Sequence, residues 1–164
     1  MTKPELIYTT YIRTTPEKVW NAITNPEFAR QYWGGHENVS DWKPDSKWTH
    51  VADDEQRTIR VVGKVVESVP PKRLVLTWAA PDNEADVSRV TFEIEPIEDM
   101  VCLNVIHGDF TPDSDMIQKV SGGWPRVLSS LKSFLETGVG LNVKAGKSCG
   151  SCGSEKPGEK AVAA

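Results

Sequence analysis

One apolar stripe with helical spacing runs along residues 113–138. Its members recur at steps of three and four, which places them on one side of a helix of roughly five turns. They are Ile117, Val120, Trp124, Val127, Leu128, Leu131, Phe134 and Leu135. Asp113 or Ser114 is suited to cap the beginning of this helix, and Gly138 is suited to end it. The pattern predicts a long amphipathic helix that needs a concave apolar partner.

The stripe is interrupted by the sequence Gly122-Gly123-Trp124-Pro125. Two glycines lower the helix propensity, and Pro125 has no N–H to donate to the carbonyl of Ser121, so a kink is expected near Ser121. Two interpretations stay open. The glycines serve the packing of a bent helix, or they leave room for something beside it.

The middle of the chain alternates between apolar and polar residues with the period of two that strands show. This pattern predicts strands over residues 6–13, 58–69, 73–80, 87–95 and 101–107, with shorter strands between 36 and 58. The joints 70–72, 81–84 and 96–99 are short and rich in turn residues, which favours antiparallel hairpins. Val90, Phe92 and Ile94 share one side of their strand, so the sheet has one apolar face.

Two short helices are predicted directly after the first strand. Thr15 precedes Pro16, Asn25 precedes Pro26, and a glutamate follows each proline. A capping side chain, a proline at the first helical position and an acid in the first turn together form a strong helix start signal. A sheet with one apolar face, two small helices and a long final helix can bury its apolar residues if the sheet wraps the last helix.

Composition suits one domain over residues 1–138 and a flexible tail over 139–164, which is rich in Gly, Ser and Lys. The net charge of −4 and the scattered basic residues argue against nucleic acid as a partner. No apolar run is long enough to span a membrane, and no signal peptide is recognised, so a cytoplasmic location is expected.

The three cysteines do not predict a disulfide framework. Cys102 lies in a predicted strand and has a packing role, while Cys149 and Cys152 form a CxxC in the predicted tail. Because a zinc site as a rule needs four ligands and no further pair completes this one, no metal and no cofactor are predicted. An idle extension, reversible oxidation or ligands supplied by a partner are the alternatives for the CxxC.

Five segments in this order resemble the START-like (SRPBCC) superfamily. They are YIRTTPEKVWNAITNPEFARQYW at 11–33, SDWKPDSKW at 40–48, VPPKRLVLTW at 69–78, SRVTFEIEP at 88–96 and SGGWPRVLSSLKSFLETG at 121–138. Within it, the chain is similar to the branch named after the C-terminal domain of the activator of heat-shock-protein-90 ATPase. The resemblance implies an α+β helix-grip fold: a curved seven-stranded antiparallel sheet wrapped around a long C-terminal helix, with two short helices after the first strand.

The resemblance also implies a cavity between the sheet and the last helix that binds a hydrophobic small molecule, such as a lipid or a polyketide-like compound. We expect the cavity to be lined by Tyr32, Trp33, Trp78, Phe92, Leu103, Val105, His107, Phe110, Ile117, Val120 and Trp124. The alternative is that these side chains only fill the core.

Two other functions remain open. Tyr32, Trp33, Trp42 and Trp48 can instead be exposed rings that dock on a chaperone or another protein, as the family's name suggests. An enzyme of the cyclase or hydrolase kind would use His107 as a general base. No sequence motif identifies a nucleophile, so a non-enzymatic binding domain is the favoured prediction.

Overall fold

The structure is a computed structural model that describes residues 3–143. In chain order its elements are β1 (Leu6–Ile12), α1 (Pro16–Thr24), α2 (Pro26–Tyr32), β2 (Glu37–Ser40), β3 (Lys47–Val51), β4 (Ile59–Val69), β5 (Arg73–Ala80), β6 (Asn83–Ile97), β7 (Met100–Gly108), α3 (Met116–Ser121) and α4 (Gly123–Thr137). This order, with two short helices after the first strand and a helix at the end, is the one expected from the sequence.

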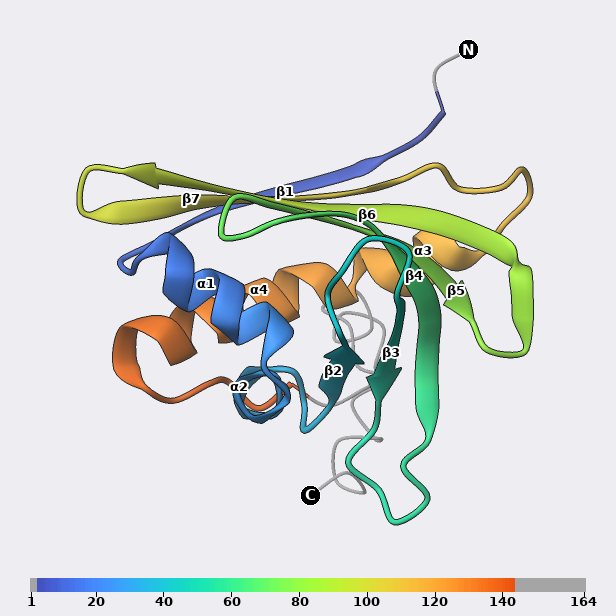
Figure 1. The fold of residues 1–164 in the computed structure, drawn as a ribbon, viewed down its shortest axis with the longest axis horizontal. Coiled ribbons are helices and arrows are strands. Elements are labelled where there is room, and N and C mark those ends of the chain that lie inside the picture. Colours follow the sequence, from blue (N-terminus) through green and yellow to red (C-terminus); the bar gives the residue numbers. More distant parts are fainter. Residues whose placement is uncertain (1–2, 144–164) are drawn as a thin grey trace, which may run out of the picture.

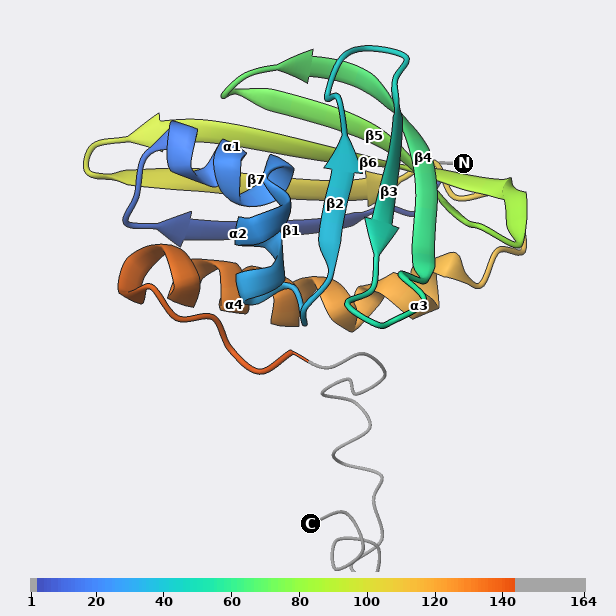
Figure 2. The same ribbon diagram turned by 60° about the horizontal axis from the view of Figure 1, so that its bottom comes forward.

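The seven strands form a single antiparallel sheet in the order β1-β7-β6-β5-β4-β3-β2. All four helices lie on one side of the sheet, which curves over them (Figures 1 and 2). α3 and α4 run beneath the sheet in Figure 1, and α1 and α2 contact both α4 and the strands. The helix-grip architecture predicted from the sequence is therefore confirmed.

Two hairpins are tighter than the sequence analysis predicted. Residues 83–84 and 96–97, which were assigned to joints, belong to β6. The ladders extend to the pairs Ala80–Asn83 and Ile97–Met100 because an antiparallel hairpin needs only two residues at its turn.

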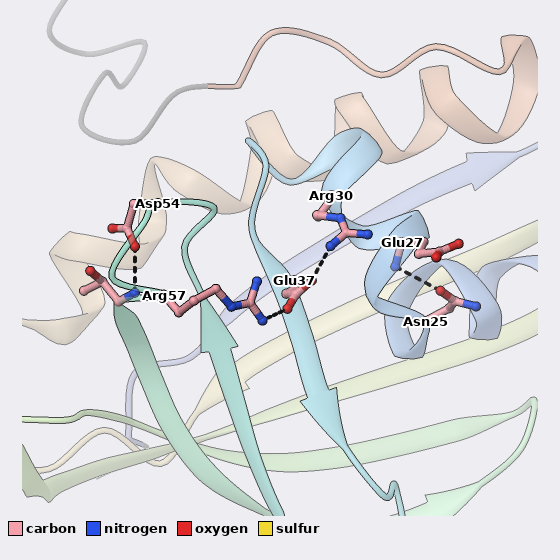
Figure 3. Close-up of polar contacts among 7 residues, drawn as sticks. Asn25, Glu27, Arg30, Glu37, Asp54 and Arg57 are labelled. Atoms are coloured by element: carbon pink, nitrogen blue, oxygen red, sulfur yellow. Dashed lines mark hydrogen bonds and ion pairs between the residues drawn. The ribbon is translucent and has the colours of Figure 1, made fainter.

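The two predicted helix starts have the expected geometry. The Thr15 hydroxyl accepts a hydrogen bond from the Lys18 N–H at 3.4 Å, and Pro16 follows as the first helical residue. The side-chain oxygen of Asn25 accepts from the Glu27 N–H at 2.9 Å at the start of α2 (Figure 3). Each cap satisfies one of the N–H groups that a helix leaves unpaired at its beginning.

The predicted kink separates α3 from α4 at Gly122. The Ser121 carbonyl, to which Pro125 cannot donate, accepts a hydrogen bond from the Tyr8 hydroxyl at 2.9 Å. β1 thus supplies the donor that the helix lacks. Gly138 ends α4 with a φ of 87°, as predicted.

The predicted beginning of the last helix was wrong by one or two residues. Asp115 is the N-cap of α3, and its side chain makes no capping bond. Asp113 has a φ of 64° in the preceding turn, so it precedes the helix. The Ser114 hydroxyl still accepts from the Met116 N–H at 3.0 Å, which satisfies one of the first helical donors.

The chain keeps contacts with the domain after α4. Ser130 is fully buried, and its hydroxyl accepts from the Leu141 N–H at 2.8 Å. Gly140 lies so close to α2 that an added Cβ would be 2.3 Å from the Gln31 carbonyl oxygen. The contacts extend to Val143, beyond the domain end predicted at residue 138. The remainder of the predicted tail, with Cys149 and Cys152, lies outside the described residues.

Candidate functional site

A cavity of about 400 Å³ lies between α3, α4 and the inner side of β3, β4 and β5, and it opens to solvent on one side. Its lining comes from α2 and the turn after it, three strands, both C-terminal helices and the returning chain. The lining residues are Trp33, His36, His50, Arg60, Trp78, Lys119, Val120, Gly123, Trp124, Arg126, Val127 and Val143. The site is therefore built where the kinked helix faces the sheet.

Three tryptophans form the aromatic wall of the cavity. Trp124 on α4 is the centre, with its ring centroid 5.7 Å from that of Trp33 and 5.6 Å from that of Trp78. Trp33 is the C-cap of α2 and Trp78 lies on β5, so three distant segments bring these rings together. Tilted ring contacts at such distances are favourable in themselves, and all three rings line the cavity.

Four of the predicted ligand-binding residues line this cavity: Trp33, Trp78, Val120 and Trp124. The others are not among its lining residues: Tyr32, Phe92, Leu103, Val105, His107, Phe110 and Ile117. Phe92 contacts the Trp124 ring edge to face at 5.9 Å, and Phe110 stacks on His107 at 4.8 Å. These two rings form a layer behind the wall.

His107 holds Trp124 in place. The indole N–H of Trp124 donates to Nδ1 of His107 at 3.0 Å, so the ring proton is on Nε2 and is directed to the Ser88 hydroxyl at 2.7 Å. The ring is fully buried, and burial lowers the pKa of His107 to about 4. A neutral imidazole with both nitrogens paired to the protein positions the wall of the cavity. It has neither the access nor the free nitrogen of a general base.

His50 is a lining residue that the sequence analysis did not select. It lies on β3 beside the Trp33 ring at 4.8 Å and stacks on His36 at 4.9 Å. Its burial, and to a smaller extent the neighbouring His36, lower its pKa to about 3. Alternation in the segment KWTHV places Trp48 and His50 on the same inward face, a signal that the sequence does contain.

A nearly buried carboxylate fixes the loop beside the cavity. Glu37 on β2 accepts from Arg30 on α2 at 2.8 Å and from Arg57 in the β3–β4 loop (Figure 3). In the same loop Asp54 accepts from the Thr58 N–H at 2.8 Å. These contacts tie the loop to α2 and thereby place Arg60, which follows it on β4, at the cavity mouth.

Of the four rings predicted to form an exposed docking surface, Trp33 and Trp42 are partly buried and pack against the core, and the prediction was wrong for Trp48 and Tyr32. Trp48 and Tyr32 each expose only 1% of their surface and belong to the core. The indole N–H of Trp48 donates to the Thr77 carbonyl at 2.7 Å, a contact for which Gly63 leaves the space. Trp48 is buried because the alternation of β3 places its side chain on the inward face of the sheet. The hydroxyl of Tyr32 donates to the Ala22 carbonyl at 2.8 Å.

Residues 3–143 show neither a metal site nor a membrane-spanning helix. Within that range no group of three or more His, Cys, Asp or Glu side chains is arranged to hold a metal ion. In the same part of the chain no helix has the length and apolar character needed to cross a bilayer.

Comparisons of the structure confirm the fold. The chain is similar to the protein SSP2350 from Staphylococcus saprophyticus, with a TM-score of 0.69 and 20% identity over 87% of this chain and 98% of that one. It is also similar to the HSP90 activator PFC0360w from Plasmodium falciparum, with a TM-score of 0.67 and 22% identity over 80% and 95% of the two chains. CalU16 from Micromonospora echinospora gives a TM-score of 0.63 and 21% identity over 79% and 73%.

Sequence comparisons then identify the family. A search among curated proteins gave no significant match. The family model of the activator of Hsp90 ATPase homolog 1-like proteins matches residues 13–136, well over half of the chain. This match confirms the resemblance derived from the sequence and places the domain in the START-like (SRPBCC) superfamily. The chain therefore belongs to the family of activator of Hsp90 ATPase homolog 1-like proteins.

Proposed function

We propose that this domain binds a small, mainly apolar molecule in the cavity between the sheet and α3–α4. The observation that carries the proposal is the wall formed by Trp33, Trp78 and Trp124 around about 400 Å³ of space. Ligand pockets in proteins are mostly apolar, with a few polar groups that fix the orientation of the ligand. Burial of ligand carbon against the rings would drive binding, at roughly 25 cal/mol per Å² of apolar surface.

The kinked helix supports this proposal. A Cβ added to Gly123 would meet nothing within 4 Å, although Gly123 lies between Gly122 and the buried Trp124. Gly123 therefore borders open space, in the cavity that it lines. The open space at Gly123 favours the interpretation in which the glycine pair leaves room beside the helix, over the one in which it only serves packing.

The size of the cavity narrows the class of ligand. About 400 Å³ is near the lower end of the range of roughly 300–1,000 Å³ that ligand pockets span. A compound of a few fused rings fits this volume better than a lipid with two acyl chains. Polyketide-like aromatics are therefore preferred to lipids.

Native mass spectrometry of the full chain, purified without denaturants, tests the proposal. We expect either a co-purified small molecule or added mass from one or more compounds in a panel of planar aromatics and lipids. A compound that binds raises the stability by RT ln(1 + [L]/Kd), about 2.7 kcal/mol at a hundredfold excess over Kd, and so raises the melting temperature. A consistently unliganded mass with no thermal shift over the panel would contradict the proposal.

A role as activator of a chaperone ATPase is suggested by the family's name and by the description of the Plasmodium falciparum neighbour. Of the four rings that would carry such docking, Trp48 and Tyr32 are in the core, and Trp33 and Trp42 are partly buried against it. No observation on the surface of residues 3–143 favours this role, and we propose ligand binding alone.

A further inference from the structure

The charged side chains that line the cavity carry one sign. Arg60 on β4, Lys119 on α3 and Arg126 on α4 line it, and none of the lining residues is an acid in the part of the chain that the structure describes. Lys119 pairs with Asp115 at 3.2 Å, an exposed contact that solvent screens. The whole chain carries a net charge of −4, so the basic lining is a local feature. Such a lining attracts an anionic group.

The buried wall offers a hydrogen-bond acceptor. His50 exposes 6% of its surface, and its Nδ1 lies 2.7 Å from the side-chain oxygen of Asn38. The amide nitrogen of Asn38 donates to the Ile23 carbonyl at 2.9 Å, which fixes the Asn38 oxygen as an acceptor. Nδ1 of His50 therefore carries the ring proton, and Nε2 presents a lone pair.

Nε2 of His50 has no donor among residues 3–143. His50 itself lines the cavity and its Nδ1 is engaged by Asn38, so Nε2 is the ring nitrogen that a ligand there can approach. The low pKa of His50 keeps the ring neutral near pH 7, so this nitrogen accepts a hydrogen bond from a hydroxyl and does not attract an anion. The buried histidine thus favours a hydroxyl group of the ligand, and the basic mouth favours an anionic group.

The aromatic wall lies beside both groups. The Trp33 ring is 4.8 Å from His50, and the Trp78 ring is 6.5 Å from it. Arg60 and Lys119 are exposed at the opening, whereas Trp124 is buried. A planar ligand against the tryptophans can direct one end to the buried histidine and the other to the basic side chains.

We propose that the ligand is a hydroxylated aromatic acid, with its rings against Trp33, Trp78 and Trp124, its hydroxyl donating to Nε2 of His50, and its acid group near the exposed Arg60 and Lys119 at the mouth. This inference rests on the proposed function and specifies its ligand. It predicts that the site binds a hydroxylated aromatic acid more tightly than a neutral hydrocarbon of the same size.

A matched series of naphthalene compounds tests the inference by isothermal titration calorimetry on the full chain. 6-Hydroxy-2-naphthoate carries both groups, 2-naphthoate lacks the hydroxyl, and the methyl ester of 6-hydroxy-2-naphthoate lacks the charge. We expect the first to bind most tightly, with Kd raised about three- to tenfold by loss of the hydroxyl and at least about tenfold by loss of the charge.

Exposed variants locate the acid group. R60Q combined with K119Q should raise the Kd of 6-hydroxy-2-naphthoate about tenfold and leave that of the methyl ester unchanged. K18Q, on the exposed side of α1, is the matched control and should change neither value. Raising the salt concentration should weaken the acid more than the ester, because salt screens the exposed charges.

The outcomes separate this inference from the proposed function. If the ester binds as tightly as the acid, or if R60Q with K119Q leaves the preference for the acid intact, the inference is overturned and the apolar site stands. If no compound of the series binds and the wider panel also fails, both are overturned. Tight binding of 6-hydroxy-2-naphthoate that is lost from the double variant and kept by K18Q supports the inference.

Discussion

Gly123 offers the sharpest test of whether the space beside α4 is a binding site. Its Cβ position is open, and its backbone φ is not in the left-handed region, so alanine fits without strain. Replacement of such a glycine stabilises a protein by about 0.4–1 kcal/mol, chiefly because the unfolded chain loses freedom. We therefore expect G123A to raise the free energy of unfolding by that amount, measured by urea denaturation.

Gly138 is the matched control. An added Cβ there also meets nothing within 4 Å, but its φ is 87°. G138A should therefore lower the free energy of unfolding by about 1 kcal/mol, because a side chain disfavours the left-handed conformation. The changes in the free energy of unfolding of G123A and G138A should therefore have opposite signs, because the two glycines differ in backbone conformation. A destabilisation by G123A as large as that by G138A would refute the placement of Gly123 beside open space.

A larger residue at the same position tests binding. In G123L four side-chain carbons extend toward the cavity, and the domain should stay folded, with a stability near that of G123A. The Kd of 6-hydroxy-2-naphthoate should rise at least tenfold, about 1.4 kcal/mol, while G123A keeps wild-type affinity within about threefold. A folded G123L that binds like the wild type would place the ligand elsewhere.

Three further predictions concern stability. Y8F should lower the free energy of unfolding by about 1 kcal/mol, since it leaves the Ser121 carbonyl without its donor, and Y11F at an exposed position should not, as urea denaturation will show. G63A should destabilise the fold by about 3 kcal/mol or more, because its Cβ would be 2.0 Å from a backbone oxygen of β5; an unchanged midpoint would contradict this close packing. The folded state lowers the pKa of His107 to about 4 from an ordinary 6.5, so below pH 6.5 the unfolded chain binds the proton more readily. Stability should therefore fall as pH decreases from 6.5 toward 4, by at most about 1.4 kcal/mol per pH unit from this residue, and a flat profile in urea denaturation across that window would contradict its buried neutral state.

Local signals in the sequence predicted most of the fold. Thr15 and Asn25 cap the helices as expected because capping depends on a side chain and backbone groups two or three residues away. The break at Gly122 follows from Pro125, which has no N–H to donate to the carbonyl of Ser121 four residues earlier. Such effects are contained in a few consecutive residues and can be read without the tertiary structure.

The site depends on contacts between distant segments, and its prediction was less complete. Periodicity placed His107 on the inward face, but its pairing with Ser88 and Trp124 depends on how β6, β7 and α4 are assembled. Arg60 is exposed and shows no periodic signal, so only the fold reveals that it lies at the cavity mouth. The contact of Val143 with the cavity likewise depends on the return of the chain after α4.

Nuclear magnetic resonance of the six indole N–H groups tests the central claim most directly, since each tryptophan gives one signal. On titration with 6-hydroxy-2-naphthoate, the signals of Trp33, Trp78 and Trp124 should shift in saturable fashion with one Kd. Those of Trp20 and Trp42, which do not line the cavity, should stay in place. Saturable shifts confined to Trp20 or Trp42, or no shifts with this compound or any in the wider panel, would contradict a ligand site between the sheet and the C-terminal helices.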